Sequence, residues 1–191
     1  MTDFPTAYIT GMTRSLRSAV LATESPFSFV QQVQDTGGER WEFSIDVMVQ
    51  RLGFEAFANG VINKRREFHL PVPKAARKVS GSPALVAAAE ASGASSLVLS
   101  GAWDGLSFKA GDFISIYHGG RHRLYQVQAD APPNGSGVAT VSILPRLRAA
   151  VTADTSVEVQ APKVTLRATT KAPATIGHVI HQFSIEAVEA L

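Results

Sequence analysis

Residues 109–148 read KAGDFISIYHGGRHRLYQVQADAPPNGSGVATVSILPRLR and decide the fold class of this 191-residue chain. The stretch holds three short apolar runs, at 113–117, 124–128 and 138–144. Turn residues separate them, first Gly119-Gly120 and then a loop rich in Pro and Gly. Short runs joined in this way predict a β-meander. The runs contain no reactive set of side chains, which favours a scaffold or a binding module over an enzyme.

Three further short runs extend this pattern, at 84–88, 96–100 and 157–160. Six short strands with regularly spaced turns predict a small barrel or sandwich. The alanine-rich segment 84–91 also has the composition of a helix. We favour a strand there because Gly and Ser flank it closely.

The strongest strand signal in the chain lies further towards the N-terminus, over Glu39–Gln50. Its apolar residues alternate with polar ones: Trp41, Phe43, Ile45, Val47 and Val49 fall on one side, and Glu42, Ser44, Asp46 and Gln50 on the other. This period of two predicts a strand with one buried face. We expect it to pair with a strand at Phe27–Gln34 through a turn at Asp35–Gly38. Residues 7–20 are weakly patterned and suit an edge strand.

The period changes after this strand. Apolar residues three and four apart, Phe54, Phe57, Ala58 and Val61, predict a short amphipathic helix. Gly53 and Gly60 weaken it, so it needs packing against the Trp41 face. Either Gly60 or Asn63 could end it.

Two proline-marked boundaries indicate the domain organisation. Pro71 and Pro73 interrupt regular structure, 74–82 reads as a linker, and Pro162 marks a second boundary. A final strand is expected at 179–188. We expect a mainly β protein with one short α-helix: residues 1–73 and 162–191 form an antiparallel β-sandwich-like domain, and 80–161 is an inserted small β-barrel or sandwich domain.

Composition limits the function classes. The chain is 45% hydrophobic and 18% charged and has no cysteine, so disulfides, thiolate metal sites and a cysteine nucleophile are excluded. The N-terminus lacks the pattern of a signal peptide, and no apolar run approaches a membrane span. We expect a protein that is made in the cytoplasm and does not insert into membranes.

The formal charge of +2 is unevenly distributed. Residues 1–63 carry four basic and seven acidic side chains, 64–78 carry six basic and one acidic, and 79–191 carry eight of each. The basic segment 64–78 could bind phosphates of a nucleic acid. It could equally be a solvated connector, which is the interpretation we favour because it contains a single aromatic residue, Phe68.

Candidate chemistry is sparse. His118 and His122 flank a turn, and His178 and His181 point to opposite faces of a predicted strand, so neither pair forms a local zinc site. A composite metal site using His69, His118 or His181 is the alternative. The acids are dispersed, and neither a GxSxG motif nor a phosphate-binding glycine loop occurs. We therefore expect no catalytic residue, metal or cofactor.

Adjacent amides at Gln31 and Gln32 place one side chain on each face of a strand. One of them could satisfy a backbone group of a neighbouring subunit. The alternative is a glutamine on the solvated face.

Two segments resemble a known family. SPFSFVQQVQDTGGERWEFSIDV, from residue 25, resembles the opening hairpin of distal tail proteins of long-tailed bacteriophages and gene-transfer particles. FKAGDFISI, HRLYQV, GVATVSI and LPRLRA resemble the inserted barrel of the same proteins, and FSIEAVEA is similar to their last strand. The resemblance covers roughly residues 24–68 and 105–190.

The resemblance implies a structural virion protein of the tail tip. It implies a ring, usually a homohexamer, that joins the tail tube protein to the baseplate hub protein while DNA passes through the lumen. Candidate subunit contacts are Phe27, Phe29, Gln31, Gln32, Lys64, Arg65 and Arg66. Candidate contacts on loops of the insert are Trp103, His118, Arg121 and Asn134, since we expect the turns at Gly119-Gly120 and Asn134–Gly137 to project from the ring.

Two other function classes stay open. The barrel could bind a cell-surface saccharide through stacking of Trp103, Phe108, Tyr117 and Tyr125. A cell-wall hydrolase would need an essential acid or His181.

Overall fold

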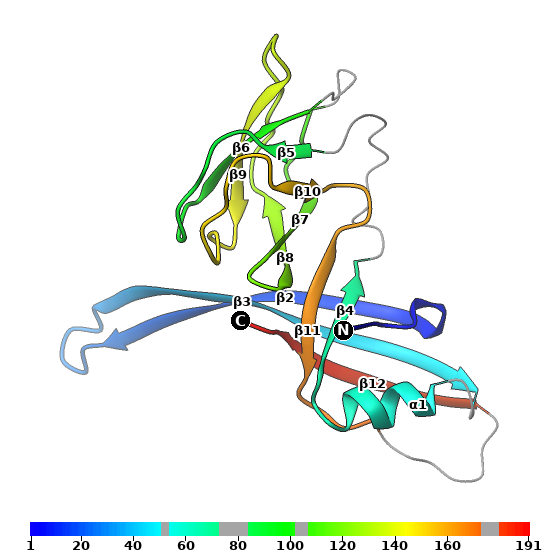
Figure 1. The fold of residues 1–191 in the computed structure, drawn as a ribbon. Coiled ribbons are helices and arrows are strands. Elements are labelled where there is room, and N and C mark those ends of the chain that lie inside the picture. Colours follow the sequence, from blue (N-terminus) through cyan, green and yellow to red (C-terminus); the bar gives the residue numbers. More distant parts are fainter. Residues whose placement is uncertain (51–53, 73–83, 102–106, 173–179) are drawn as a thin grey trace.

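The computed structural model describes residues 1–50, 54–72, 84–101, 107–172 and 180–191. It has one sheet and one closed barrel (Figure 1). The strand order in the sheet is β1-β4-β11-β12-β3-β2, and the sheet is mixed because β1 runs parallel to β4. Its strands are β1 (Thr2–Asp3), β2 (Ile9–Glu24), β3 (Gln31–Gln50), β4 (Glu67–Pro71), β11 (Lys163–Ala168) and β12 (Ile180–Glu189).

The expected barrel is confirmed. Its six strands are antiparallel and close in the order β10-β5-β6-β9-β8-β7. They are β5 (Ala84–Val86), β6 (Ser96–Ser100), β7 (Phe113–His118), β8 (Arg121–Val127), β9 (Val138–Leu144) and β10 (Ser156–Glu158). The alanine-rich segment begins as a strand, as favoured. Apolar residues from these strands fill the barrel with a core of its own.

The chain enters and leaves the barrel through two neighbouring strands of the sheet. β4 ends at Pro71, and β11 begins at its pairing partner Lys163. All barrel strands lie between these two positions in the sequence. The barrel therefore stands on one pair of adjacent strands.

The alternation in Glu39–Gln50 has the predicted consequence. Trp41, Phe43, Ile45, Val47 and Val49 are all buried in the core of the sheet. Phe54 and Ile62 of the helical segment belong to the same core, and so do Phe113 and Leu124 of the barrel. One apolar face of β3 thus supports both the helical segment and the base of the barrel.

The expected hairpin pairing was wrong. Residues 35–38 do not turn: β3 runs through them and pairs with β2, so the loop lies at 25–30. Ser18 pairs with Glu39 and Val20 with Asp35, which leaves two extra residues in β3. Gly37, with φ of 71°, lies in this bulge. Residues 35–38, whose Asp-Thr-Gly-Gly sequence is typical of a turn, therefore form a bulge within a continuous strand.

The predicted helix is present but irregular. It starts as α1 (Glu55–Phe57) and continues as one π-helical segment, η2 (Ala58–Ile62), with Asn63 after its last residue. Gly60 does not end it. Phe54 and Ile62 are buried against the core, and this packing holds a segment too short to be stable alone.

Candidate functional site

The β2–β3 hairpin extends beyond the rest of the sheet. β12 pairs with β3 only from Glu42 to Gln50, so residues 31–41 of β3 pair with β2 alone among the described strands. Figure 1 shows the resulting two-stranded arm projecting on the side opposite the helix. We call residues 17–40 the hairpin arm. An arm of two strands has little core of its own and exposes both faces.

The end of the hairpin arm carries a group of exposed apolar side chains, which we call the tip patch. Phe27 is 96% exposed and Phe29 is 76% exposed. The other members are Val20, Leu21, Val30 and Val33, each exposed by 48% or more. Adjacent strand residues such as Val20 and Leu21 point to opposite faces, so these side chains are spread over both faces of the arm. Their exposure indicates contacts with another molecule.

The backbone of the tip holds Phe29 in an unfavourable conformation. Its φ is 54°, in the left-handed region that bulky residues rarely adopt. The tip is closed by hydrogen bonds from Phe29 N–H to the Ser25 carbonyl, 2.9 Å, and from Ser25 N–H to the Val30 carbonyl, 3.1 Å. A strained aromatic residue that is nevertheless exposed suggests that its ring serves a contact made outside the chain.

Gln31 and Gln32 lie at the start of β3, beside the tip. The Gln31 amide donates a hydrogen bond to the Glu24 carboxylate at 3.0 Å, so it is used within the arm. Gln32 is exposed. No cation among the described residues forms an ion pair with Glu24.

A groove lies at the opposite end of β2. Its volume is about 940 Å³, and it is bounded by the first half of β2 and by the two connections between sheet and barrel. The lining residues used below are Ile9, Met12, Arg14, Pro71, Val72 and Ala161. We call this concavity the β2 groove. Its volume falls within the range of about 300–1,000 Å³ that is typical of binding pockets.

Arg14 stands at the wall of the β2 groove. Its guanidinium carbon lies 3.9 Å from the centre of the Phe113 ring, a cation–π contact with the base of the barrel. Among the described residues no carboxylate pairs with it. The groove therefore combines apolar and threonine side chains with one positive charge that has no anionic partner among the described residues.

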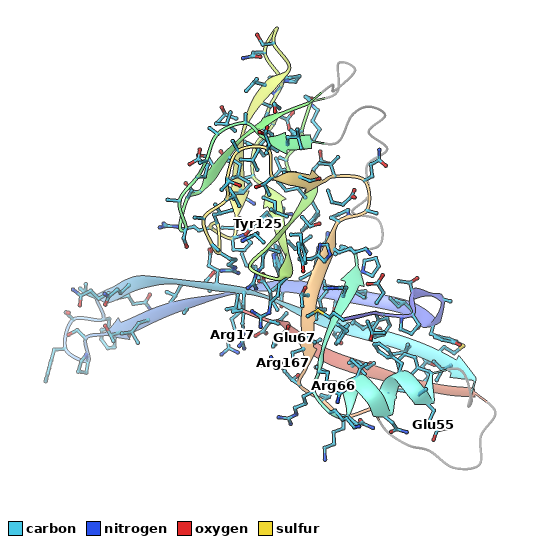
Figure 2. All side chains as sticks on the ribbon, viewed as in Figure 1. Arg17, Glu55, Arg66, Glu67, Tyr125 and Arg167 are labelled. Carbon is cyan, nitrogen blue, oxygen red and sulfur yellow. The ribbon has the colours of Figure 1, made fainter. Side chains whose placement is uncertain are left out.

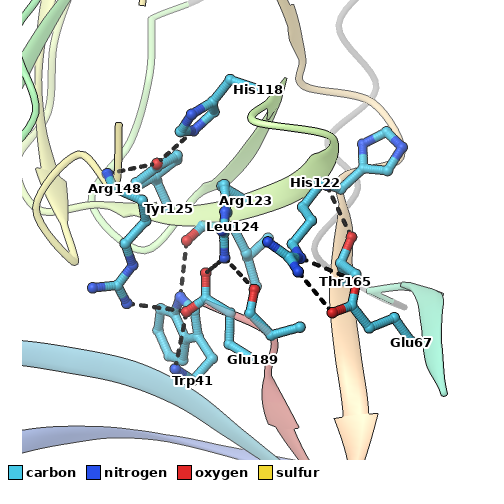
Figure 3. A network of polar contacts seen from close by, with 12 residues as sticks. Trp41, Glu67, His118, His122, Arg123, Leu124, Tyr125, Arg148, Thr165 and Glu189 are labelled. Carbon is cyan, nitrogen blue, oxygen red and sulfur yellow. Dashed lines mark hydrogen bonds and ion pairs between the residues drawn. The ribbon is translucent and has the colours of Figure 1, made fainter. Parts of the chain in front are cut away.

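A buried polar network joins the barrel to the sheet (Figure 3). Glu189 is 3% exposed; its Oε2 accepts from Arg148 Nη2 at 3.0 Å, and Oε1 lies 3.7 Å from Arg123 Nη1. Arg123 also donates to the Ala190 carbonyl. Trp41 donates its indole N–H to the Leu124 carbonyl at 2.9 Å. These contacts fix the barrel on the sheet.

Tyr125 and His118 form an inner extension of this network. The Tyr125 hydroxyl accepts from the Arg148 backbone N–H at 3.2 Å and can donate to His118 Nε2 at 2.9 Å. Burial raises the pKa of Tyr125 to about 12 and, together with the charge of Arg123, lowers the pKa of His118 to about 4. Both groups are therefore neutral near pH 7.

The described histidines do not assemble a metal site. His69 and His122 come together, with ring centres 4.7 Å apart, and His69 Nδ1 lies 3.0 Å from Thr165 Oγ1. His118 faces Tyr125 instead. Over the described part of the chain, no three His, Asp or Glu side chains gather around a common point. The His181 side chain lies outside the described set.

The predicted contacts on the insert are divided between two ends of the barrel. The Gly119-Gly120 turn does not project, because Arg121 binds Glu67 of the sheet through two hydrogen bonds, 2.8 and 3.0 Å, which lower the Glu67 pKa. His118 lies at the same junction. Asn134 is exposed in a turn whose backbone it caps at Ser136. Trp103 lies outside the described residues.

Two of the aromatic residues considered for saccharide stacking are inside the barrel. Phe108 is 7% exposed and Tyr125 is fully buried, whereas Tyr117 is 57% exposed. Tyr117 packs against His122, with ring centres 4.9 Å apart. The described residues thus leave one aromatic side chain of that set on the surface.

The basic residues expected at a subunit contact lie far from the tip patch. Lys64, Arg65 and Arg66 are exposed in the turn after η2, and Figure 2 shows Arg66 beside the helical segment, away from the projecting arm. The structure brings together Phe27, Phe29, Gln31 and Gln32 but does not join these basic residues to them.

Comparisons with known proteins add no relative: no protein-family model matches the chain, and no curated protein matches its sequence. Within the described residues, no helix is long and apolar enough to cross a membrane. The site is therefore interpreted from its own geometry.

Sequence reasoning missed the buried glutamate and the full extent of the tip patch. The period of two in FSIEAVEA places Glu189 on the same face as Ile185 and Ala187, which are buried, so the signal was present. The tip patch gave no such signal, because Val20 and Leu21 join it only through the pairing of β2 with β3.

Proposed function

We propose that the protein is a structural subunit of a bacteriophage tail tip, a distal tail protein whose copies form a ring between the tail tube and the baseplate hub. The observation that carries this proposal is the hairpin arm with its tip patch. The resemblance of residues 24–68 and 105–190 to distal tail proteins supplies the class of assembly and the expected hexamer. A scaffold function is also compatible with the buried polar network, whose side chains hold the barrel on the sheet.

The tip patch supports self-assembly because its exposure has a free-energy cost that a partner removes. Burying a side chain such as Phe27 or Phe29 contributes about 1.5–3 kcal/mol. Association costs at least about 4 kcal/mol in lost translational and rotational freedom. A single tip contact is therefore weak, and closing a ring, in which every copy makes two contacts, stabilises the assembly further.

The exposed edge of the sheet supports the same function. β2 is the last strand of the sheet and spans Ile9–Glu24. Unpaired edges recruit neighbouring chains unless something covers them. A ring made by heterologous contacts would cover this edge in each copy.

The proposal is tested first on particles. Antibody labelling of purified virions or gene-transfer particles should place the chain at the tail tip, and particles made without it should lack an assembled tip. Absence of the chain from purified particles would overturn the function. The purified protein should also form rings at high concentration, visible by electron microscopy, that Phe27→Asp disrupts while its circular dichroism spectrum stays unchanged.

A further inference from the structure

The end of the hairpin arm and the β2 groove lie at opposite ends of β2 and cannot meet within one molecule. Glu24, beside the tip, and Arg14, at the groove, are ten positions apart in β2. At about 3.3 Å per residue, the strand separates them by roughly 30 Å. Any contact between the two surfaces must therefore join two copies.

Both surfaces carry apolar side chains, and the groove has room for an aromatic ring. The tip presents Phe27 and Phe29, and the groove offers about 940 Å³ bounded by apolar side chains such as Met12 and Val72. Aromatic rings are the side chains that most often act as anchors when buried in such a pocket. A Phe ring also fits beside a guanidinium, as Arg14 already shows against Phe113.

The two surfaces are also complementary in charge. Glu24 flanks the tip and hydrogen-bonds to the neutral Gln31, while Arg14 contacts the Phe113 ring. Neither has an oppositely charged partner among the described residues. Arg17, three positions from Arg14 on the same strand, differs because it pairs with Glu42.

We propose that the β2 groove receives the hairpin tip of a second copy of this chain, with Phe27 in the groove and Glu24 paired with Arg14. This inference rests on the proposed function and names the contact that builds the ring. The contact joins different surfaces on the two copies, so it is heterologous and propagates from copy to copy. It also covers the first half of the exposed edge strand.

Charge reversal tests the contact directly on the full-length protein. Glu24→Arg and Arg14→Glu should each weaken assembly at least about tenfold in analytical ultracentrifugation, the effect of losing one anchoring interaction. A chain carrying both changes should assemble again, because its tip arginine meets a groove glutamate. Lys171→Glu, a charge reversal at an exposed residue outside the arm and the groove, is the control and should leave assembly within about threefold of the wild type.

Mixing two defective chains tests the direction of the contact. Phe27→Asp keeps its groove and Arg14→Glu keeps its tip. At a protein concentration at which the wild type forms rings, each variant alone should show no complex larger than a weak dimer, while an equal mixture should form a heterodimer and nothing larger. The absence of a heterodimer, with both chains folded by circular dichroism, overturns the head-to-tail contact. Rings that are indifferent to Glu24→Arg and Arg14→Glu overturn the inference and leave the proposed function standing. A wild-type chain that never self-associates overturns the inference, and the particle test then decides the function separately.

Discussion

Glu189 Oε2, at the end of the last strand of the sheet, lies 3.0 Å from Nη2 of Arg148 in the barrel. Glu189 is almost completely buried, and Arg123 lies on its other side. Two arginines around one buried carboxylate form a network in which each member depends on the others. The attachment of the barrel to the sheet therefore depends on the buried Glu189 carboxylate, and we expect substitutions at this position to be destabilising.

Replacing Glu189 with Ala should destabilise the fold strongly. The substitution leaves the Arg123 and Arg148 guanidiniums buried without their anion, which costs about 3–5 kcal/mol. Urea unfolding followed by circular dichroism measures the effect. Glu24→Ala, which removes an exposed carboxylate, is the control and should change the free energy of unfolding by less than about 0.5 kcal/mol. An equal effect of the two changes would contradict the burial of Glu189.

Trp41→Phe should lower the free energy of unfolding by about 1–3 kcal/mol, because it leaves the buried Leu124 carbonyl without its indole N–H donor. Tyr117→Phe removes a polar atom from an exposed ring and serves as the comparison. Native-state hydrogen exchange would add a local readout: amides at the base of the barrel should lose protection in the Trp41 variant. Unchanged protection there would show that the hydrogen bond does not hold the junction.

Stability should fall as the pH is lowered from about 6.5 to about 4. The pKa of His118 is lowered to about 4 in the folded state, from 6.5 in the unfolded chain. Between these values the unfolded state binds more protons, so acid favours unfolding. The lowered pKa values of His69 and His122 act in the same direction.

His118→Gln isolates the contribution of this histidine. Glutamine can still accept a hydrogen bond from the Tyr125 hydroxyl, but it does not titrate. The free energy of unfolding should therefore change less between pH 6.5 and 4 in the variant than in the wild type. Chemical denaturation at a series of pH values provides the comparison. Identical slopes would mean that His118 is exposed to protons in the folded state.

Phe29→Gly should stabilise the monomer and weaken assembly. Glycine adopts the positive φ of this position without strain, a gain of about 1 kcal/mol. The same change at Phe27 removes a ring without relieving a positive φ, so it should give no gain in stability. Thermal unfolding and sedimentation on the two variants separate the effects. A destabilised Phe29→Gly monomer would contradict the strain assigned to the tip.

The strands of the barrel could be predicted from sequence because their signal is local. Alternation and turn residues near Gly119-Gly120 and Asn134 marked where strands begin and end. The pairing of the hairpin arm could not be predicted, because residues 35–38 have the composition of a turn. These residues form a bulge because β2 pairs with β3 on both sides of them, and this pairing is visible only in the structure.

The candidate site was predicted in part, for the same reason. Phe27 and Phe29 were selected from their position in the opening hairpin, although they lie in its loop and not in a strand. The β2 groove was out of reach, since it joins Met12 to Val72 and Ala161 across long separations in sequence. Arg14 gave no signal, because an arginine without an acidic partner is recognised only once its neighbours are known.

The placement of the barrel between Pro71 and Lys163 has an evolutionary consequence. Because the chain departs and returns at one pair of neighbouring positions, a cassette of any length could be exchanged there without breaking the sheet. The exchange is nevertheless limited where the barrel contacts the sheet, which we call the seam. There, any inserted domain must place a carbonyl group against Trp41 and cationic side chains against Glu189. Diversification of such a protein should therefore spare the seam and accumulate at the distal loops around Asn134.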